Sequence, residues 1–396
     1  MLPFGNGRSY GDVCLNPKGT AVMTRGLDRF MSFDAATGRF VCEAGMLLSD
    51  ILAHIVPTGW FLPVVPGTRY VTLGGAVGND VHGKNHHTAG SFGCHVRRFE
   101  LLRSDGERII CSADENSDYF AATIGGLGLT GLILWVEVQL LPIPGARMNV
   151  ETVGFRTLGE FTLLSSTYAG ADEYTVAWLD LTKGRAAREE GVFLSGKHAA
   201  GAAPAASKRP LPVPLTPPLS LVDSLSTAVI NRLYRTKADK KFTESQEKFF
   251  FPLDGIGGWT RLYGPRGFYQ YQCVIPQEAG IEPIRDMLKT VDRDGIYSFL
   301  AVLKTFGARM SPGMLSFPCA GVTLSIDVPN GGDNTLRFFD RLDAIVMAAG
   351  GRLYPAKDVR MPARVFKAGF PQWQRFAEFV DPHFSSAFWR RVTEDA

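Results

Sequence analysis

The sequence lacks several features that would assign it at once to a class of protein. Its six cysteines contain no Cys-x-x-Cys pair, and their spacing fits neither a zinc site nor a disulfide framework, so we expect reduced, mostly buried thiols. The formal net charge is only +3, which gives no compositional case for nucleic acid as a partner. Hydrophobic residues make up 45% and charged residues 20%, which is the composition of an ordinary globular protein.

Signals for export and for membrane insertion are also missing. Met1 is followed at once by a proline and two glycines, without the basic and apolar segments of a signal peptide. The most apolar stretch, 127–142, contains Glu137 and Gln139 and is rich in glycine and β-branched residues. It predicts two buried strands rather than a membrane span. We therefore expect a protein that is cytoplasmic or bound peripherally to a membrane.

The 396 residues suggest about two domains. Residues 1–146 are rich in glycine, with short strands separated by tight turns, whereas 147–351 alternate longer strands and helices. From 352 to 396 the sequence pattern again resembles that of the first region. We expect an α+β protein in which 147–351, built on a largely antiparallel sheet, is inserted into a domain formed by the two ends.

Local periodicity predicts individual elements. The expected strands are 39–44, 269–275 and 322–328, with a hairpin over 99–111 that turns at Asp105-Gly106. The expected helices are 47–56, 281–291 and 336–349. The segment 199–219, rich in alanine and proline, is typical of a mobile loop.

Two glycine-rich segments are candidates for holding an anion. One is GNGRSYGD at 5–12, and the other is PGTRYVTLGGAVG at 66–78. Glycines let the backbone adopt positive φ and approach a ligand closely, so that successive amide N–H groups can surround an anion. Neither segment fits the Rossmann fingerprint or the P-loop. Ordinary turn chemistry is the alternative for either segment alone, but two such segments in one domain suit a pyrophosphate held from two sides.

Four of the seven histidines lie in a third segment, DVHGKNHHTAGSFGCH at 80–95. The four-residue spacing of His82 and His86 would allow a metal site, and buried structural histidines are another explanation. Glycines interrupt the segment, however, and Lys84 would repel a cation. We therefore expect no metal site and favour a cofactor or substrate site.

Taken together, four segments resemble the vanillyl-alcohol-oxidase family of FAD-linked flavoproteins: GNGRSYGD (5–12), PGTRYVTLGGAVGNDVHGKNHHTAGSFG (66–93), GGLGLTG (125–131) and GGRLYPAKD (350–358). The resemblance continues through YQYQCVIP (269–276) and YSFLAVLKTFG (297–307), and so covers nearly the whole chain. The HGKNHHTAGSFG run is its most specific part, because the glycine segments alone indicate only the wider family. Within the family, the resemblance is to the branch that oxidises the C2 hydroxyl of a polyprenyl-phosphoryl ribose.

The resemblance implies an α+β domain that binds FAD and an inserted antiparallel-sheet domain that covers the flavin ring. It assigns the cofactor to Gly5, Asn6, Gly7, Arg8, Ser9, Tyr10, Gly67, Thr68, Thr72, Gly74, Gly75, Asp80, His82, Gly83, Asn85, Thr130, Gly131, Ile133, Tyr354, Ala356 and Lys357. Many members attach the flavin through a histidine in the first glycine segment. This chain has Gly7-Arg-Ser-Tyr10 there, so we expect non-covalent FAD. Members also have a longer segment before this loop, so the FAD domain is expected to be short at its N-terminus, with an incomplete edge.

The implied chemistry assigns roles to a few side chains. FAD would accept the hydride. His82 is the expected base for the hydroxyl proton, because histidine is the side-chain type whose ordinary pKa best suits that role. Tyr10 would assist by hydrogen bonding, while Lys304 and Lys357 would stabilise negative charge or hold a phosphate. The expected substrate residues are Lys84, Trp178, Phe250, Gln272, Lys304, Thr323 and Ser325. At three of these positions, Phe250, Thr323 and Ser325, the related branch has tyrosine, asparagine and cysteine, which leaves the substrate fit open.

An amphipathic stripe follows the alanine- and proline-rich segment. Its apolar members recur at helical spacing: Leu221, Val222, Leu225, Val229, Ile230 and Leu233. Basic residues accompany and follow them: Arg232, Arg235, Lys237, Lys240 and Lys241. Such a stripe either covers its own sheet, which is the commoner arrangement, or lies on an anionic membrane.

Three functions remain for comparison. The first is oxidation of a lipid-linked ribose, after which an NAD-dependent reductase would complete the epimerisation to arabinose. The second is a flavin oxidase of a soluble alditol, sugar or lactone. The third is a flavin-binding protein without turnover. Reduction of bound flavin by substrate separates the third from the other two.

Overall fold

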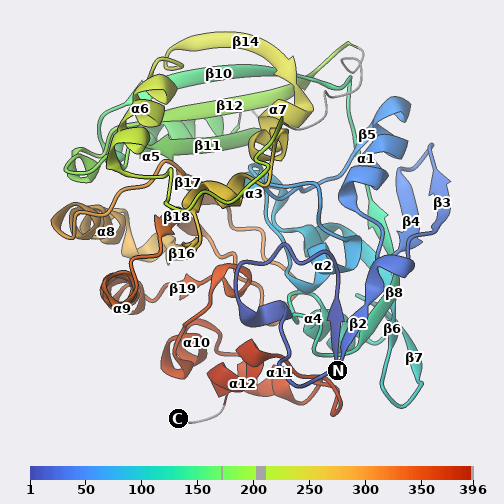
Figure 1. Ribbon diagram of the computed structural model, residues 1–396. Coiled ribbons are helices and arrows are strands. Elements are labelled where there is room, and N and C mark those ends of the chain that lie inside the picture. Colours follow the sequence, from blue (N-terminus) through green and yellow to red (C-terminus); the bar gives the residue numbers. More distant parts are fainter. Residues whose placement is uncertain (171–172, 202–210, 394–396) are drawn as a thin grey trace. The chain divides into compact units, whose positions relative to one another are not determined.

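The computed structural model describes residues 1–170, 173–201 and 211–393 (Figure 1). The chain divides into two compact units. Unit 1 comprises Met1–Ala146, Arg309–Pro318 and Pro355–Ala396, and unit 2 comprises Arg147–Ala308 and Cys319–Tyr354. Both units combine helices with antiparallel sheets, so the expected α+β class is confirmed.

The two units differ from the division expected from the sequence. The chain enters unit 2 after Ala146, but the segment Arg309–Pro318 returns to unit 1, and the last crossing follows Tyr354 rather than residue 351. The sequence shows no sign of the short return, because its contacts are made with residues more than two hundred positions away.

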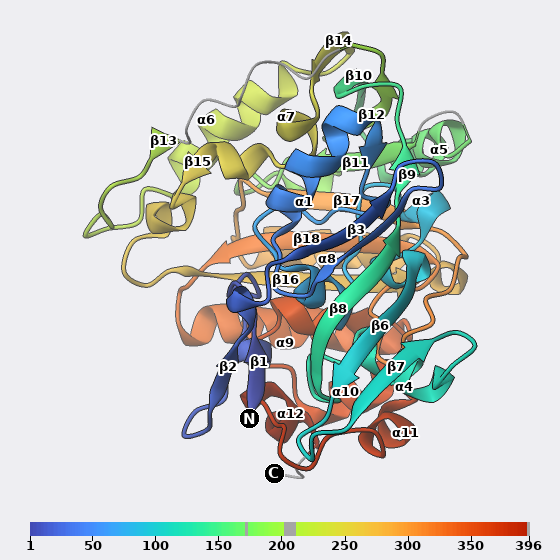
Figure 2. The ribbon, with the colours of Figure 1, turned by 90° about the vertical axis from the view of Figure 1, so that its right-hand side faces the viewer.

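Unit 1 is built on a five-stranded antiparallel sheet in the order β3-β4-β8-β6-β7 (Figure 2). These strands are Phe30–Asp34, Arg39–Glu43, Leu132–Gln139, Val96–Leu102 and Arg108–Ser112. The expected strand at 39–44 and the hairpin turned at Asp105-Gly106 are confirmed, and Gly106 supplies the φ of +92° that the turn needs. The two strands predicted within 127–142 are β8 and β9 (Leu141–Pro142), but they begin only at Leu132. Residues 127–131 form turns instead, with positive φ at Leu127, Gly128 and Gly131.

Short helices accompany this sheet. Helix α1 (Leu48–Ile55) is the expected helix; its apolar residues at positions 48, 51, 52 and 55 are buried, and it ends before a glycine in the left-handed region. The other helices are α2 (Leu73–Gly78), α3 (His86–Ala89), α4 (Ser117–Thr123), α10 (Ala363–Gly369), α11 (Trp373–Ala377) and α12 (Ala387–Thr393). Two small sheets complete the unit, β1 (Leu2–Phe4) with β2 (Ala21–Met23) and β5 (Trp60–Phe61) with β9.

Unit 2 is built on an eight-stranded sheet in the order β14-β10-β12-β11-β17-β18-β16-β19, in which every pair is antiparallel. Along this order the strands are Lys240–Ser245, Arg147–Phe155, Gly191–Ala199, Tyr174–Leu179, Ala301–Phe306, Gly321–Pro329, Phe268–Pro276 and Arg352–Leu353. The expected strands at 269–275 and 322–328 are confirmed as β16 and β18. A further pair, β13 (Leu211–Pro212) with β15 (Ile256–Gly257), is parallel.

Helices lie on both faces of this sheet. The expected helices at 281–291 and 336–349 are confirmed as α8 (Glu282–Arg293) and α9 (Asp333–Ala348), and with α5 (Leu158–Tyr168) they cover one face through contacts to odd-numbered strand residues. Helices α6 (Ser224–Arg235) and α7 (Gln246–Phe250) lie on the other face (Figure 1). Tyr234 of α6 contacts the Trp178 ring, and Phe250 of α7 contacts the Tyr174 ring. The prediction of a mobile loop over 199–219 falls partly on 202–210, which lie outside the described residues.

No helix in the described part of the chain combines the length and the apolar character needed to cross a bilayer.

Candidate active site

The two glycine segments lie side by side in unit 1. The amide Nδ2 of Asn6, in the first segment, donates to the carbonyl oxygen of Tyr70, in the second, at 2.6 Å. The guanidinium of Arg8 lies 5.7 Å from the centre of the Tyr70 ring. A Cβ on Gly5 would come within 2.5 Å of the Thr72 hydroxyl oxygen. The loops therefore have the adjacency that an anion held from two sides requires.

Local contacts fix the shape of each loop. Thr72 caps α2, its hydroxyl oxygen accepting from the Gly75 N–H at 3.1 Å. Gly7 has a φ of +57°, and a Cβ there would lie 2.9 Å from the Phe4 ring. At Gly67, by contrast, a Cβ would meet no other atom within 4 Å, so the backbone of the second loop is open at that point.

The third glycine segment lies against the end of α2. The N–H groups of Gly125 and Leu127 donate to the carbonyl oxygens of Val77 and Gly78 at 3.0 and 2.7 Å. Thr130, expected near the adenine, is buried, and its hydroxyl pairs with that of Thr123 at 2.8 Å. Its neighbour Gly131 has a φ of +146°, and Ile133 is buried in β8.

Asp80 organises the histidine segment. It is fully buried, and one carboxylate oxygen accepts from the Gly93 N–H at 2.7 Å. The other accepts from the hydroxyls of Ser311 and Ser316 at 2.6 and 2.5 Å. Burial raises the pKa of Asp80, and the hydrogen bonds from the two serines oppose that rise. The carboxylate thus joins the two ends of 80–93 and ties them to Arg309–Pro318, contacts that the sequence did not reveal.

His82 is held by this frame. Its backbone forms an antiparallel bridge with Ser91, and its ring lies 5.5 Å from that of Phe317 in a tilted arrangement. His82 is 7% exposed, and Lys84 is half-buried. Among the described residues no group of three His, Cys, Asp or Glu side chains could hold a metal ion.

Asn85 presents a buried polar atom that bears on cofactor binding. Its Nδ2 donates to the Pro63 carbonyl oxygen at 2.8 Å, while its Oδ1 has no hydrogen-bond partner in the described part of the chain. A Cβ on Gly83 would come within 2.8 Å of that Oδ1. A buried acceptor without a donor costs about 1–3 kcal/mol, so this oxygen fits a donor on a bound molecule. Together with the two adjacent glycine loops, this buried acceptor fits FAD.

The segment 350–358 meets the first glycine loop. The Tyr10 N–H donates to the Ala356 carbonyl oxygen at 2.9 Å, and the Lys357 ammonium lies 4.0 Å from the centre of the Tyr10 ring. Gly11 is required beside them, because a Cβ there would overlap the Asp358 carbonyl oxygen at 1.5 Å. Tyr10 and Lys357, two of the expected catalytic residues, are therefore neighbours.

Arg391 holds this junction and was not found from the sequence. Its guanidinium pairs with Asp12 at 2.7 Å and with Asp358 at 3.0 Å. Burial raises the pKa of Asp358, and the charge of Arg391 opposes that rise. The only sequence signal for Arg391 was the pair of adjacent arginines, Arg390 and Arg391, near the end of α12. Such pairs are common on protein surfaces and do not predict ion pairs with buried carboxylates.

The expected substrate residues of unit 2, except Phe250 on α7, share one face of its sheet. Register places Trp178 opposite Val302, Val302 opposite Ser325, and Ser325 opposite Gln272. The Tyr354 N–H donates to the Gln272 carbonyl oxygen at 2.9 Å, which extends the row to β19. Two residues further along the same strands, Lys304 lies opposite Thr323. Since side chains alternate along a strand, one face carries six expected site residues: Trp178, Lys304, Thr323, Ser325, Gln272 and Tyr354.

Contacts within this face are specific. Gln272 donates through Nε2 to the Thr323 hydroxyl at 3.2 Å, and that hydroxyl donates to the Cys273 carbonyl oxygen at 2.7 Å. The Trp178 indole donates to the Phe299 carbonyl oxygen at 3.3 Å. Phe250 is buried in α7, with its ring edge-on to Tyr174 at 4.7 Å.

Comparison with known proteins agrees with this geometry. Residues 1–112 match the family described as "FAD binding domain". The chain is 38% identical to decaprenylphosphoryl-β-D-ribose oxidase of Mycolicibacterium smegmatis, over 99% of this chain and 89% of that protein. It is 34% identical to an uncharacterized protein of Streptomyces coelicolor, over 85% of this chain and 97% of that protein. Mouse L-gulonolactone oxidase is 30% identical over 35% of this chain and 31% of its own length. The chain is thus an FAD-dependent oxidoreductase and belongs to the family of FAD-linked oxidases that includes decaprenylphosphoryl-β-D-ribose oxidase.

Proposed function

We propose that this protein oxidises the C2 hydroxyl of a polyprenyl-phosphoryl ribose to the 2-keto sugar. The observation that carries the proposal is the likeness to decaprenylphosphoryl-β-D-ribose oxidase along nearly the whole of both chains. The shorter likeness to L-gulonolactone oxidase involves about a third of each chain, which supports shared flavin binding more than a shared substrate.

FAD, when bound, supplies the hydride acceptor. The two glycine loops would hold its pyrophosphate through backbone N–H groups, and the buried Asn85 Oδ1 would accept from a donor on the cofactor. Asp80 would act by fixing the histidine segment, because its carboxylate oxygens are engaged by donors of unit 1.

His82 would take the proton of the C2 hydroxyl. Its burial and the bridge to Ser91 hold the imidazole in place, which favours a base that must meet one particular hydroxyl. The Lys357 ammonium, over the Tyr10 ring, would supply positive charge beside the developing negative charge.

The face of unit 2 that carries Gln272, Thr323, Ser325 and Lys304 would bind the sugar and its phosphate. Amide and hydroxyl groups suit the ribose hydroxyls, and an ammonium suits the phosphate. The Trp178 ring is buried against Tyr234 and would support this face rather than stack on the sugar. Lys84, in unit 1, is a further cation that the resemblance assigns to the substrate.

Two consequences of this chemistry concern partners. A C2 ketone becomes the arabinose epimer only when a hydride is returned to the other face, so an NAD-dependent reductase would act next. A polyprenyl chain resides in a bilayer, so the enzyme would work as a peripheral protein at a membrane surface.

The test is the visible spectrum of the purified FAD-bound protein under anaerobic conditions. Addition of a polyprenyl-phosphoryl ribose should bleach the oxidised flavin bands, whereas the corresponding arabinose compound should bleach them more slowly. Bleaching by soluble alditols or lactones, without bleaching by the lipid-linked ribose, would support the soluble-substrate alternative instead. Flavin that no alcohol reduces would indicate a binding protein without turnover.

A further inference from the structure

Helix α6 is oriented with its polar side inward. Residues two positions apart on a helix lie on nearly opposite sides, and residues four apart lie on the same side. Thr227 and Asn231 are 0% and 1% exposed, whereas Leu225, Val229 and Leu233 are 72%, 52% and 62% exposed. Of the two arrangements left open by the sequence, the one in which the apolar stripe covers its own sheet is therefore excluded. Of the stripe residues only Val222, which precedes the helix, is buried.

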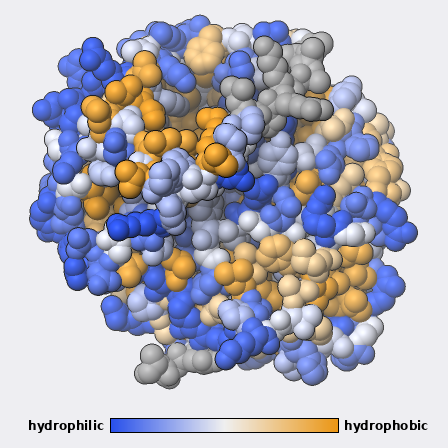
Figure 3. Space-filling view, in the orientation of Figure 1, coloured by the Kyte–Doolittle hydropathy of each residue, from blue (hydrophilic) through white to orange (hydrophobic). Residues whose placement is uncertain are grey.

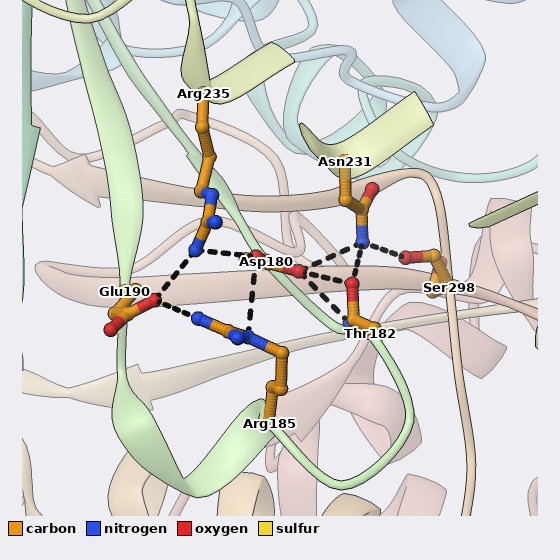
Figure 4. A network of polar contacts seen from close by, with 7 residues as sticks. All are labelled: Asp180, Thr182, Arg185, Glu190, Asn231, Arg235 and Ser298. Carbon is orange, nitrogen blue, oxygen red and sulfur yellow. Dashed lines mark hydrogen bonds and ion pairs between the residues drawn. The ribbon is translucent and has the colours of Figure 1, made fainter. Parts of the chain in front are cut away.

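A polar network explains this orientation (Figure 4). The Asn231 amide donates to a carboxylate oxygen of Asp180 at 3.0 Å, to the Thr182 hydroxyl at 3.1 Å and to the Ser298 carbonyl oxygen at 3.3 Å. Asp180 is 4% exposed, and Arg235 pairs with it at 3.4 Å. Turning α6 over would bury its leucines but would take the Asn231 amide and the Arg235 cation away from this buried carboxylate, which is costly.

Two of the five basic residues expected beside the apolar stripe are engaged in ion pairs within unit 2. Arg235 pairs with Glu190 at 2.9 Å as well as with Asp180, so it belongs to the inner side of α6. Lys241 pairs with Glu151 across the strands β14 and β10 at 3.1 Å. Arg232, Lys237 and Lys240 are exposed.

Apolar side chains gather on the outer surface of α6 and beside it. We define the α6 patch by its exposed large apolar residues: Leu221, Leu225, Val229, Ile230 and Leu233. In Figure 3 an apolar area lies at the upper left, where Figure 1 has α6. Leu215 and Leu219, in the segment that precedes the helix, are also exposed, each by 77%. Contiguous exposed apolar surface of this kind marks an interaction site.

The helix that carries the α6 patch also contacts the proposed substrate face, through its inner side. On the inner side of the helix, the Tyr234 ring lies 4.7 Å from that of Trp178, the first residue of the row that crosses the sheet. The Lys237 ammonium lies 4.7 Å from the Tyr234 ring. A helix that contacts the substrate face on one side and exposes leucines on the other is suited to a substrate with a sugar head and a lipid tail.

We propose that the α6 patch docks on an anionic lipid bilayer, an inference that rests on the proposed function. Charge complementarity selects this occupant: Arg232 is exposed on α6 next to Leu233, and Lys237 and Lys240 are exposed in the segment that directly follows the helix. Exposed cations close to an apolar helix side are typical of helices that lie in the membrane interface. The leucines insert among the acyl chains, and the cations meet lipid phosphates. The buried Asn231–Asp180 network holds the helix on the sheet while its outer side contacts lipid.

The test is co-sedimentation of the full-length, FAD-bound protein with vesicles of phosphatidylcholine alone or mixed with phosphatidylglycerol. The patch variant is Leu225→Gln with Leu233→Gln. Its matched control is Leu163→Gln with Met347→Gln, exposed apolar residues on α5 and α9, which cover the opposite face of the sheet. The charge variant is Arg232→Gln with Lys240→Gln, which leaves the internal pairs of Arg235 intact.

The wild type and the control should bind the anionic vesicles and release them as salt is added. The patch variant should bind at least about tenfold more weakly. The charge variant should lose about fivefold in affinity per cation removed. Unchanged binding by the patch variant, or equal binding of the wild type to neutral and anionic vesicles, overturns the inference. A wild-type dimer that the patch variant loses, without vesicle binding, assigns the surface to a second copy and also overturns it.

Flavin bleaching by a short-chain prenyl-phosphoryl ribose in detergent separates this inference from the proposed function. The patch variant should bleach at the wild-type rate there, because its substitutions lie on the outer side of α6. If bleaching occurs but vesicles are not bound, the docking inference fails and the proposed function stands. If the wild type is not bleached, the proposed function fails, and the docking inference that rests on it falls with it.

Discussion

Replacement of Asp80 tests the frame that holds the histidine segment. Asp80→Ala removes the acceptor for the Gly93 N–H and for the hydroxyls of Ser311 and Ser316. A buried N–H left without an acceptor costs about 1–3 kcal/mol. The two hydroxyls are 2.8 Å apart and can pair with each other, so their loss is smaller. We expect the free energy of unfolding to fall by about 2–4 kcal/mol in total.

The assay is thermal unfolding of the FAD-free protein, followed by tryptophan fluorescence. In a unit of about 200 residues, each kcal/mol lowers Tm by about 2–4 °C, so Asp80→Ala should melt about 5–15 °C below the wild type. The control is Asp34→Ala. Asp34 also accepts three hydrogen bonds, from Ala36 and Thr37, but it is exposed, so water can replace the lost acceptor and Tm should stay close to that of the wild type.

The pH dependence gives a second readout. Burial raises the pKa of Asp80 in the folded protein, so the folded carboxyl retains its proton at a pH where the unfolded one has lost it. The stability that Asp80 contributes is therefore full below the ordinary pKa of aspartate and declines as pH rises through the folded-state pKa. The Tm difference between wild type and Asp80→Ala should narrow as pH rises. A Tm within about 2 °C of the wild type, or a difference that widens with pH, would refute the reasoning.

The remaining predictions concern cofactor, catalysis and thiols. Acid precipitation should release the yellow colour into the supernatant, and colour retained in the pellet would contradict non-covalent FAD. His82→Ala should stay folded yet slow flavin reduction by about 10²–10⁴-fold, and Lys357→Ala should slow it as well; a wild-type rate in either variant would remove that residue from the mechanism. Burial raises the pKa of Cys111 and of Cys273 to about 12 and raises that of Cys42 as well, so these thiols should react with Ellman's reagent at pH 8 only after unfolding.

The sequence by itself determined the elements whose pattern is local. Strand alternation predicted β16 and β18, and helical spacing predicted α1, α8 and α9, because a short window of residues contains the whole signal. Resemblance of the glycine and histidine segments to an FAD-linked family predicted the cofactor, which the comparisons support.

Only the tertiary structure decided which way α6 faces and where the histidine segment is fastened. The spacing of Leu225, Val229 and Leu233 establishes an apolar side of the helix but not its direction, because the sheet-side partners of the helix, Asp180 and the Ser298 carbonyl, come from other parts of the chain. Asp80 likewise finds its serines more than two hundred residues away, in a short return of the chain. Periodicity is a property of a segment, whereas a buried charge or amide takes whichever partner the fold places beside it, and that choice settles which side of a helix meets solvent.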